Sequence, residues 1–466
     1  MDDDTATAPT PDDTAAPGRT GPSTLRNTLV AGAMFVGRAL FAFVTVALVA
    51  KYLGPDGRGR VVFVSNLIGL VALAAASGTA TGINRLRAAE GVDSHSLVLA
   101  SGVLAAVVGA LAAVLVVGVA LLGDAPLIAE GIPGVLFGLL VVALVALTAF
   151  SSLSQVAALD NRLGAVTVTA LVGALVYAAW TGISAALGTI SVADNLTAWA
   201  VSSILPTGML AVVLWRGAPP GRPSVRPVLR RLARISVQAN LASLAVLAIW
   251  RIDVLIVELR RGYTELGRYS VAVALAEIVV VTAMALRSAI LPHHGHDDST
   301  LAEIIARTTR IAVVFTVVVA SAVGAVGPLL IPLLFGQDYA GAYPALALLL
   351  PGAVLLVLHF PLFDFVAARS GVRGLTVVAT TALAFNVAAN WWALGRWSYV
   401  AASVVSSVTY GIVFVGCVWL FTDRTGLGVR ETVLLQRADL APLVEVLRRR
   451  PLLAERDEHV AGREGP

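Results

Sequence analysis

Twelve apolar stretches, each long enough to cross a membrane as a helix, follow one another from Leu29 to Phe421. About 20 apolar residues span a ~30 Å hydrocarbon core, and a helix pairs every backbone N–H and C=O internally. The expected spans are 27–50, 61–84, 97–122, 132–158, 165–187, 195–215, 236–258, 269–291, 309–334, 342–368, 374–394 and 398–422. The gaps between them are short and polar, so the pattern predicts an all-α polytopic membrane protein with about 12 transmembrane helices.

Composition agrees with this pattern. Hydrophobic residues make up 58% of the chain, charged residues make up 13%, and the mean hydropathy is +0.85. A soluble protein carries about 25% charged residues, so a globular soluble chain is excluded. The single cysteine, Cys417, lies in an apolar span, which excludes a disulfide framework and a thiolate metal site.

The positive charges indicate an orientation. With the N-terminus inside, most Arg residues fall on inner loops and tails, and the longest inner loop contains Arg216, Arg222, Arg226, Arg230, Arg231 and Arg234. Positive residues accumulate on the cytoplasmic side of a membrane. We therefore expect a multi-pass protein of the bacterial cytoplasmic membrane with both termini cytoplasmic, and we attribute the net charge of +4 to these loops rather than to nucleic-acid binding.

The same loop divides the chain into two halves of similar length. The pattern Gly54, Gly59 and Arg60 recurs as Gly262, Gly267 and Arg268, at a constant offset of 208. Glycine is common in loops between helices, so three matched residues alone are weak evidence for an internal repeat. The similar lengths of the two halves strengthen that evidence. Two related halves predict two pseudo-symmetric six-helix bundles around a central cavity. The expected units are a disordered cytoplasmic tail (1–26), an N-terminal six-helix lobe (27–215), a basic cytoplasmic linker (216–235), a C-terminal six-helix lobe (236–422) and a charged cytoplasmic tail (423–466).

Charged residues inside the spans are the first candidates for function. A charge near the bilayer centre costs about 2.5–3.5 kcal/mol on insertion scales, so such residues usually face protein or water. Arg38 lies in the first span of one half and Arg251 in the first span of the other. Guanidinium groups bind phosphate in a bidentate manner, so a cavity between these two residues suits an anion. The alternative is that each residue forms an interhelical ion pair that only fixes packing.

Further polar residues extend this candidate site. Ser77, Thr81 and Arg85 follow one another at spacings of four in the second span, which is consistent with a cavity-lining stripe. Hydrogen bonds to a neighbouring helix and ordinary anchoring of Arg85 on the cytoplasmic side are the alternatives. Three carboxylates inside spans are candidates for ion or proton coupling: Asp253, Glu277 and Asp364.

No cofactor is expected. The cluster between His293 and Asp298 has the composition of a metal site but not the ligand spacing, so we interpret it as a solvated turn. The sequence contains no phosphate-binding loop, nucleophile elbow or HExxH motif. We therefore expect a transporter without nucleotide hydrolysis, driven by an ion or voltage gradient or by a partner.

Four segments resemble polysaccharide-export membrane proteins of the multidrug/oligosaccharidyl-lipid/polysaccharide (MOP) exporter superfamily, in the branch that contains the O-antigen-type flippases. They are ALVAKYLGPDGRGRVVF from Ala47, WRIDVLIVELRRGYTELGRYSVAVALAE from Trp250, LFGQDYAGAYPAL from Leu334 and NVAANWWALGRWSYVAASVVSSVTY from Asn386. The last segment departs from the family pattern, because Ala401 and Ala402 follow the turn without the second glycine. The resemblance covers about residues 27–422.

The resemblance implies a flippase that moves a polyprenyl-pyrophosphate-linked oligosaccharide from the cytoplasmic to the outer leaflet. It assigns the pyrophosphate contact to Arg38 and Arg251, with Arg85, Ser77 and Thr81 as further substrate-binding candidates. The expected partners are the lipid-linked substrate, membrane lipids, and a polysaccharide polymerase or glycosyltransferases.

Three alternatives remain open. A multidrug exporter of the same superfamily would need carboxylates where organic cations bind, and the spans of the N-terminal half offer none. A lipid II-type flippase shares the architecture, although it has fourteen helices rather than twelve. A membrane polymerase or glycosyltransferase would need a large extracytoplasmic loop, and the outer loops here are short.

Overall fold

A computed structural model describes residues 22–122, 134–217, 224–238, 241–290, 298–369, 373–436 and 438–439. Every regular element assigned in these ranges is a helix, and nine helical segments within them are long and apolar enough to cross a membrane. The fold is that of an all-α polytopic membrane protein. Most of the expected N-terminal tail, the turn at 293–297 and the chain after Asp439 lie outside the described residues, and the first helix begins within the expected tail, at Pro22.

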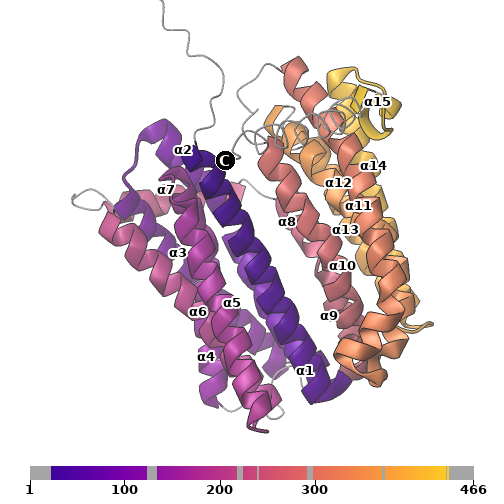
Figure 1. Ribbon diagram of the computed structural model, residues 1–466. Helices are drawn as coiled ribbons and strands as arrows, with labels where there is room; N and C mark the ends of the chain where they lie inside the picture. The colour runs from indigo at the N-terminus through magenta and orange to yellow at the C-terminus, as the bar shows by residue number, and fades with distance from the viewer. Residues whose placement is uncertain are drawn as a thin grey trace, which may run out of the picture.

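The helices, in chain order, are α1 (Pro22–Ala76), α2 (Thr79–Glu90), α3 (Ser94–Leu122), α4 (Gly134–Leu159), α5 (Leu163–Ala186), α6 (Val192–Gly217), α7 (Val225–Gln238), α8 (Leu241–Ile249), α9 (Ile252–Arg261), α10 (Tyr263–Ile290), α11 (Asp298–Phe335), the 3₁₀ helix η2 (Gln337–Ala342), α12 (Tyr343–Arg369), α13 (Arg373–Leu394), α14 (Val400–Thr425) and α15 (Val429–Val433). They form two bundles, which we call the N-lobe (α1–α7) and the C-lobe (α8–α15) (Figure 1). The lobes meet at the end where α1 bends, and they lie further apart at the end that carries α2, α7 and α15. We call these the hinge end and the α7 end.

A glycine turns the chain at the hinge end of each lobe. α1 contains two expected spans, and the residue that bends it, Gly54, has φ 66° and ψ −178°. Its counterpart at the offset of 208, Gly262, has φ 81° and ψ 176° between α9 and α10. This region of backbone space is open essentially to glycine alone. The repeat seen in the sequence therefore corresponds to two equivalent bends, one in each lobe.

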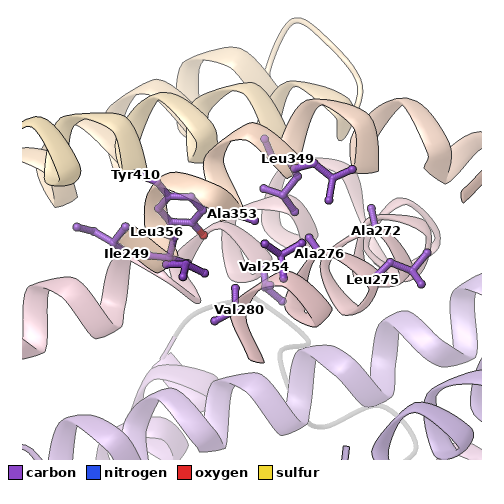
Figure 2. Packing of buried hydrophobic residues seen from close by; sticks show 14 of the residues in the cluster. Ile249, Val254, Ala272, Leu275, Ala276, Val280, Leu349, Ala353, Leu356 and Tyr410 are labelled. Carbon is purple, nitrogen blue, oxygen red and sulfur yellow. The ribbon is translucent and has the colours of Figure 1, made fainter. Parts of the chain in front are cut away.

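The C-lobe packs around α10 and α12. Figure 2 shows buried side chains of this lobe meeting in one cluster, including Ile249 of α8, Val254 of α9, Leu275 of α10, Leu356 of α12 and Tyr410 of α14. The same apolar cluster continues into the N-lobe near the hinge end, where Phe63 is 1% exposed. The lobes are therefore joined by a continuous packed region at the hinge end.

Two expected spans are not continuous helices. The span 236–258 is divided into α8 and α9, with Trp250 and Arg251 in the break. The second span ends at Ala76, and α2 begins after Gly78, whose φ is +81°. A Cβ on Gly78 would lie 2.1 Å from the carbonyl oxygen of Ser236, so this glycine permits α2 to pack closely on α7. The segment expected as a basic loop thus contains the helix α7.

Candidate functional site

A cavity of about 220 Å³ lies between the lobes, on the α7 side of the hinge. Its wall comes from both arms of α1, from α5 and α6, from the break before α9, and from α9 and α10. The lining residues are Ala42, Thr45, Val46, Val49, Arg58, Val61, Val62, Ser65, Asn66, Tyr177, Trp199, Arg251, Val254, Ser270, Val273, Ala274 and Glu277. Because both lobes contribute, relative motion of the lobes must change the shape of this cavity.

Arg251 lies in this wall, as the candidate site requires, but it is not alone. Its Nη2 is 2.9 Å from Oε1 of Glu277, and the two side chains are 34% and 36% exposed. Its guanidinium also lies 5.7 Å from the centre of the Trp250 ring. The pair therefore borders open space rather than a dry contact, and both groups keep faces that a ligand can reach. Glu277, which we considered for coupling, is in direct contact with the candidate anion-binding arginine.

Arg58 is a second cation in the cavity wall, and the sequence interpretation missed it. The expected spans 27–50 and 61–84 leave it in the loop between them. The structure places it inside the second arm of α1, with only 4% of its surface exposed. Its Nη1 donates to the carbonyl of Val46 at 3.3 Å and its Nη2 to the carbonyl of Ser270 at 3.4 Å, while its Nε has no hydrogen-bond partner among the described residues. The expectation that Arg58 lies in a loop between two spans is therefore wrong.

Arg38 lies outside the cavity wall, towards the α7 end. It precedes Ala42 by one turn and Thr45 by two, so its side chain leaves α1 on the same face that lines the cavity. Its Cα lies about 6 Å further along the helix than that of Ala42. Arg38 is exposed, and within the described part of the chain it has no ion-pair partner. Arg38 therefore lies about one helical turn from the cavity wall, on its α7 side.

Arg38 and Arg251 are not equivalent residues of the two halves. At the offset of 208, Arg38 corresponds to Val246 and Arg251 corresponds to Phe43. Both arginines nevertheless lie on the first spans of their lobes. They are therefore placed at different depths, with Arg251 in the cavity wall and Arg38 nearer the α7 end.

The polar stripe proposed for the second span is interrupted. Ser77 lies in the break at Gly78 and donates to the carbonyl of Ala74 at 2.7 Å, while Thr81 and Arg85 lie one turn apart on α2 and are exposed. The three side chains therefore do not form one continuous stripe. None of them belongs to the wall of the described cavity. Their role in substrate binding stays a prediction.

The other two coupling candidates lie away from the cavity wall. Asp253 is buried inside the C-lobe, where its carboxylate accepts hydrogen bonds from Tyr269 Oη at 2.5 Å and Ser406 Oγ at 2.9 Å. Asp364 is half-buried on α12 and is likewise not a lining residue. Asp253 connects α9, α10 and α14, so a change in its charge would act on packing within the C-lobe rather than directly on a ligand.

This arrangement favours an anion. The described wall holds two guanidinium groups, Arg58 and Arg251, against the single carboxylate of Glu277. Hydroxyl and amide groups of Thr45, Ser65 and Asn66 add neutral polar contacts to the same wall. Among the described residues, no group of three or more His, Cys, Asp or Glu side chains is arranged to hold a metal ion.

The fold and this interlobe cavity define a two-lobed membrane transporter. The chain belongs to the polysaccharide biosynthesis protein family, whose model matches residues 24–295. This range contains every residue of the cavity wall. The resemblance noted in the sequence is thereby confirmed. A search of curated proteins gives no match to the chain.

Solved structures share the fold at low sequence identity. An inward-facing multidrug resistance MATE family transporter of the MOP superfamily is 16% identical, with a TM-score of 0.60 over 84% of this chain and 94% of that chain. The lipid II flippase MurJ in an inward closed conformation is 11% identical, with a TM-score of 0.62 over 87% and 89%. An outward-facing MATE transporter is 15% identical, with a TM-score of 0.58 over 85% and 94%. These likenesses establish the fold as that of MOP-superfamily transporters.

Proposed function

We propose that this protein is a flippase that moves a polyprenyl-pyrophosphate-linked oligosaccharide across the bacterial cytoplasmic membrane by alternating access, for polysaccharide biosynthesis. The observation that carries the proposal is the cavity between the lobes, whose wall holds Arg58 and Arg251 against Glu277. An excess of guanidinium groups suits pyrophosphate, because each group can donate two parallel hydrogen bonds to phosphate oxygens. Family membership supports the glycan part of the substrate.

The shape of the molecule supports a route for the substrate. The α7 end carries Arg226, Arg230 and Arg231 on α7, which favours a cytoplasmic location for this end. The head group enters between the lobes there, meets Arg38 on the approach, and reaches Arg251 in the cavity wall. The polyprenyl chain stays in the bilayer during this passage. Opening of the hinge end then releases the glycan on the outer side, and both chain termini remain cytoplasmic.

The test is transport in proteoliposomes. A polyprenyl-pyrophosphate disaccharide with a nitrobenzoxadiazole group on its sugar is incorporated in both leaflets, and dithionite added outside bleaches only the outer label. The protein is expected to expose the inner pool to dithionite, and Arg251→Gln is expected to lose this activity. Arg260→Gln is the matched control, because Arg260 is an exposed arginine that lies over the Trp391 ring, outside the cavity.

The alternatives give different results in the same vesicles. A lipid II-type flippase would move a pentapeptide-bearing disaccharide in preference to one without the peptide. A multidrug exporter would move a cationic dye such as ethidium and leave the labelled lipid in place. Failure to move any lipid-linked sugar, in vesicles where the protein is folded, would refute the proposed function.

A further inference from the structure

Arg58 holds an unusual position for a cation. It is buried at the junction of the lobes, and within the described part of the chain it forms no ion pair. Its two hydrogen bonds go to opposite lobes, to Val46 in the N-lobe and to Ser270 in the C-lobe. The carboxylate of Glu277 in the same wall acts on Arg58 only from a distance. A buried charge without an ion-pair partner in contact costs free energy, so this arrangement is a high-energy state of the side chain.

The present acceptors are weak. Val46 and Ser270 lie within helices, so each carbonyl also accepts the amide N–H four residues further on. The distances of 3.3 and 3.4 Å exceed the ~2.7–2.9 Å of charge-assisted hydrogen bonds, and the Nε has no acceptor in the ranges that the structure describes. An anion in the adjoining cavity would offer charged oxygens to the same five N–H groups. Arg58 would therefore gain from leaving the carbonyls.

The internal repeat shows what packing alone would select at this position. The residue equivalent to Arg58 at the offset of 208 is Leu266, which is fully buried. The two residues follow equivalent bends, and both precede a glycine that contacts the opposite lobe, Gly59 and Gly267. One lobe thus closes the hinge end with an apolar side chain and the other with a guanidinium. A residue that only held the lobes together would not need the charge.

We propose that Arg58 is an anion-responsive switch of the hinge end. An anion that enters the cavity draws the guanidinium from the Ser270 carbonyl, which removes a contact between the lobes and favours their separation at that end. This inference rests on the proposed function, since pyrophosphate supplies the anion, and it makes opening conditional on a loaded cavity. It assigns Arg58 the role of deciding when the outer side opens.

The experiment measures the separation of the lobes at the hinge end. Spin labels are attached to cysteines at Leu187, in the loop between α5 and α6, and at Ser398, between α13 and α14, in a Cys417→Ala background; both labelled positions are exposed. Distances are recorded by double electron–electron resonance with and without inorganic pyrophosphate, and with sodium chloride at the same ionic strength. Pyrophosphate is expected to lengthen the distance in the parent protein, and chloride is not.

Arg58→Leu is the decisive variant, because it installs the residue found at the equivalent position. It is expected to keep the short distance with and without pyrophosphate, to lose transport, and to raise the unfolding temperature by removing the unpaired charge. Arg58→Lys keeps the charge as a point donor and is expected to retain the response with about a tenfold loss of pyrophosphate affinity. Arg260→Gln is expected to behave as the parent.

The outcomes separate the switch from the function. A lower unfolding temperature for Arg58→Leu, or a pyrophosphate response equal to that of the parent, would show that Arg58 is a structural residue. Transport of the labelled lipid by the parent without any pyrophosphate-dependent change in distance would refute the switch alone. Absence of transport by the folded parent would refute the function on which the switch rests.

Discussion

Gly59 and Gly267, 208 positions apart, make the same contact from opposite lobes. A Cβ built on Gly59 would lie 1.9 Å from the carbonyl oxygen of Tyr263, and one built on Gly267 would lie 1.9 Å from the carbonyl oxygen of Pro55. Pro55 and Tyr263 are themselves equivalent at this offset. The two contacts are thus related by the pseudo-twofold axis between the lobes, and each places a helix backbone directly against the other.

From these two contacts we predict that both glycines are needed to close the hinge end. Gly59→Ala or Gly267→Ala must push a backbone carbonyl away, which we expect to cost on the order of 2 kcal/mol and to lengthen the distance between labels at Leu187 and Ser398 without any anion. Gly69→Ala is the matched control, because Gly69 lies in α1 with no atom within 4 Å of the added Cβ. Equal distances and unfolding temperatures for Gly59→Ala and Gly69→Ala would contradict this role.

The contact between Arg251 and Glu277 predicts opposite effects of neutralising its two members. Glu277→Gln removes the carboxylate that competes with an anion, so pyrophosphate affinity is expected to rise about tenfold. Arg251→Gln is expected to lower it by a similar factor. Isothermal titration with pyrophosphate measures both, and the double variant gives the coupling between the two groups. A fall in affinity for Glu277→Gln would mean that the carboxylate orients Arg251 rather than competes for it.

The architecture followed from the sequence because it depends on length, hydropathy and local backbone chemistry. Spans of about 20 apolar residues have few folding options in a bilayer. Gly54 and Gly262 have positive φ at the two bends, a local backbone conformation that glycine adopts readily. The offset of 208 indicated two related halves, and the structure shows that the same residues form the two bends and the two interlobe contacts.

The site was only partly predictable because its key contacts are between lobes. The hydropathy pattern placed Arg58 in a loop, because a charged residue between two glycines is typical of the end of a transmembrane span. Burial of that charge results from closure of the hinge end, which no local pattern encodes. One signal was available: the repeat aligns Arg58 with Leu266, a substitution of a buried apolar residue by a cation. Likewise, the partner of Arg251 depends on the packing of α10 against the break before α9.

A comparison of Arg38 with Arg85 tests which arginine the substrate meets on its way to the cavity. Both are exposed, and neither has an ion-pair partner among the residues that the structure describes. Only Arg38 shares the helix face of Ala42 and Thr45, which line the cavity. Arg38→Gln is therefore expected to slow transport of the labelled lipid about tenfold without lowering the unfolding temperature, whereas Arg85→Gln is expected to slow it less, because Arg85 lies outside the cavity wall. Equal losses in the two variants would place the approach along α2 instead.

The final prediction concerns residues 429–436 and 438–439, which we call the C-terminal strap. Asp439 accepts hydrogen bonds from Arg310 Nε at 2.6 Å and from Nη2 at 2.8 Å, and both side chains are buried. Arg310 also donates through Nη1 to the Glu431 carbonyl, and Arg307 lies 3.7 Å from the same carboxylate. The strap that follows α14 is thereby fixed to α11 near the α7 end.

This ion pair sets the pH dependence of the strap. The hydrogen bond from Arg310 is the main cause that holds the pKa of Asp439 below its ordinary value. A carboxyl with a lowered pKa in the folded state stabilises that state at pH values above the unfolded pKa of about 3.9, and the contribution is lost as the pH falls through the folded pKa. Hydrogen exchange of the strap is therefore expected to be unchanged between pH 7 and pH 5, after correction for intrinsic rates, and to lose protection by pH 3.

Asp439→Asn separates this pair from other acid effects. It leaves Arg310 buried without its counter-charge, which costs about 3 kcal/mol, so the protection of the strap at pH 7 is expected to fall about a hundredfold and to lose its pH dependence. Asp298→Asn is the matched control, because Asp298 pairs with Arg369 at 3.1 Å on the surface and is worth at most about 0.5 kcal/mol. If both variants lose protection equally, or if Asp439→Asn stays protected at pH 7, the strap is held by its apolar contacts and not by Arg310.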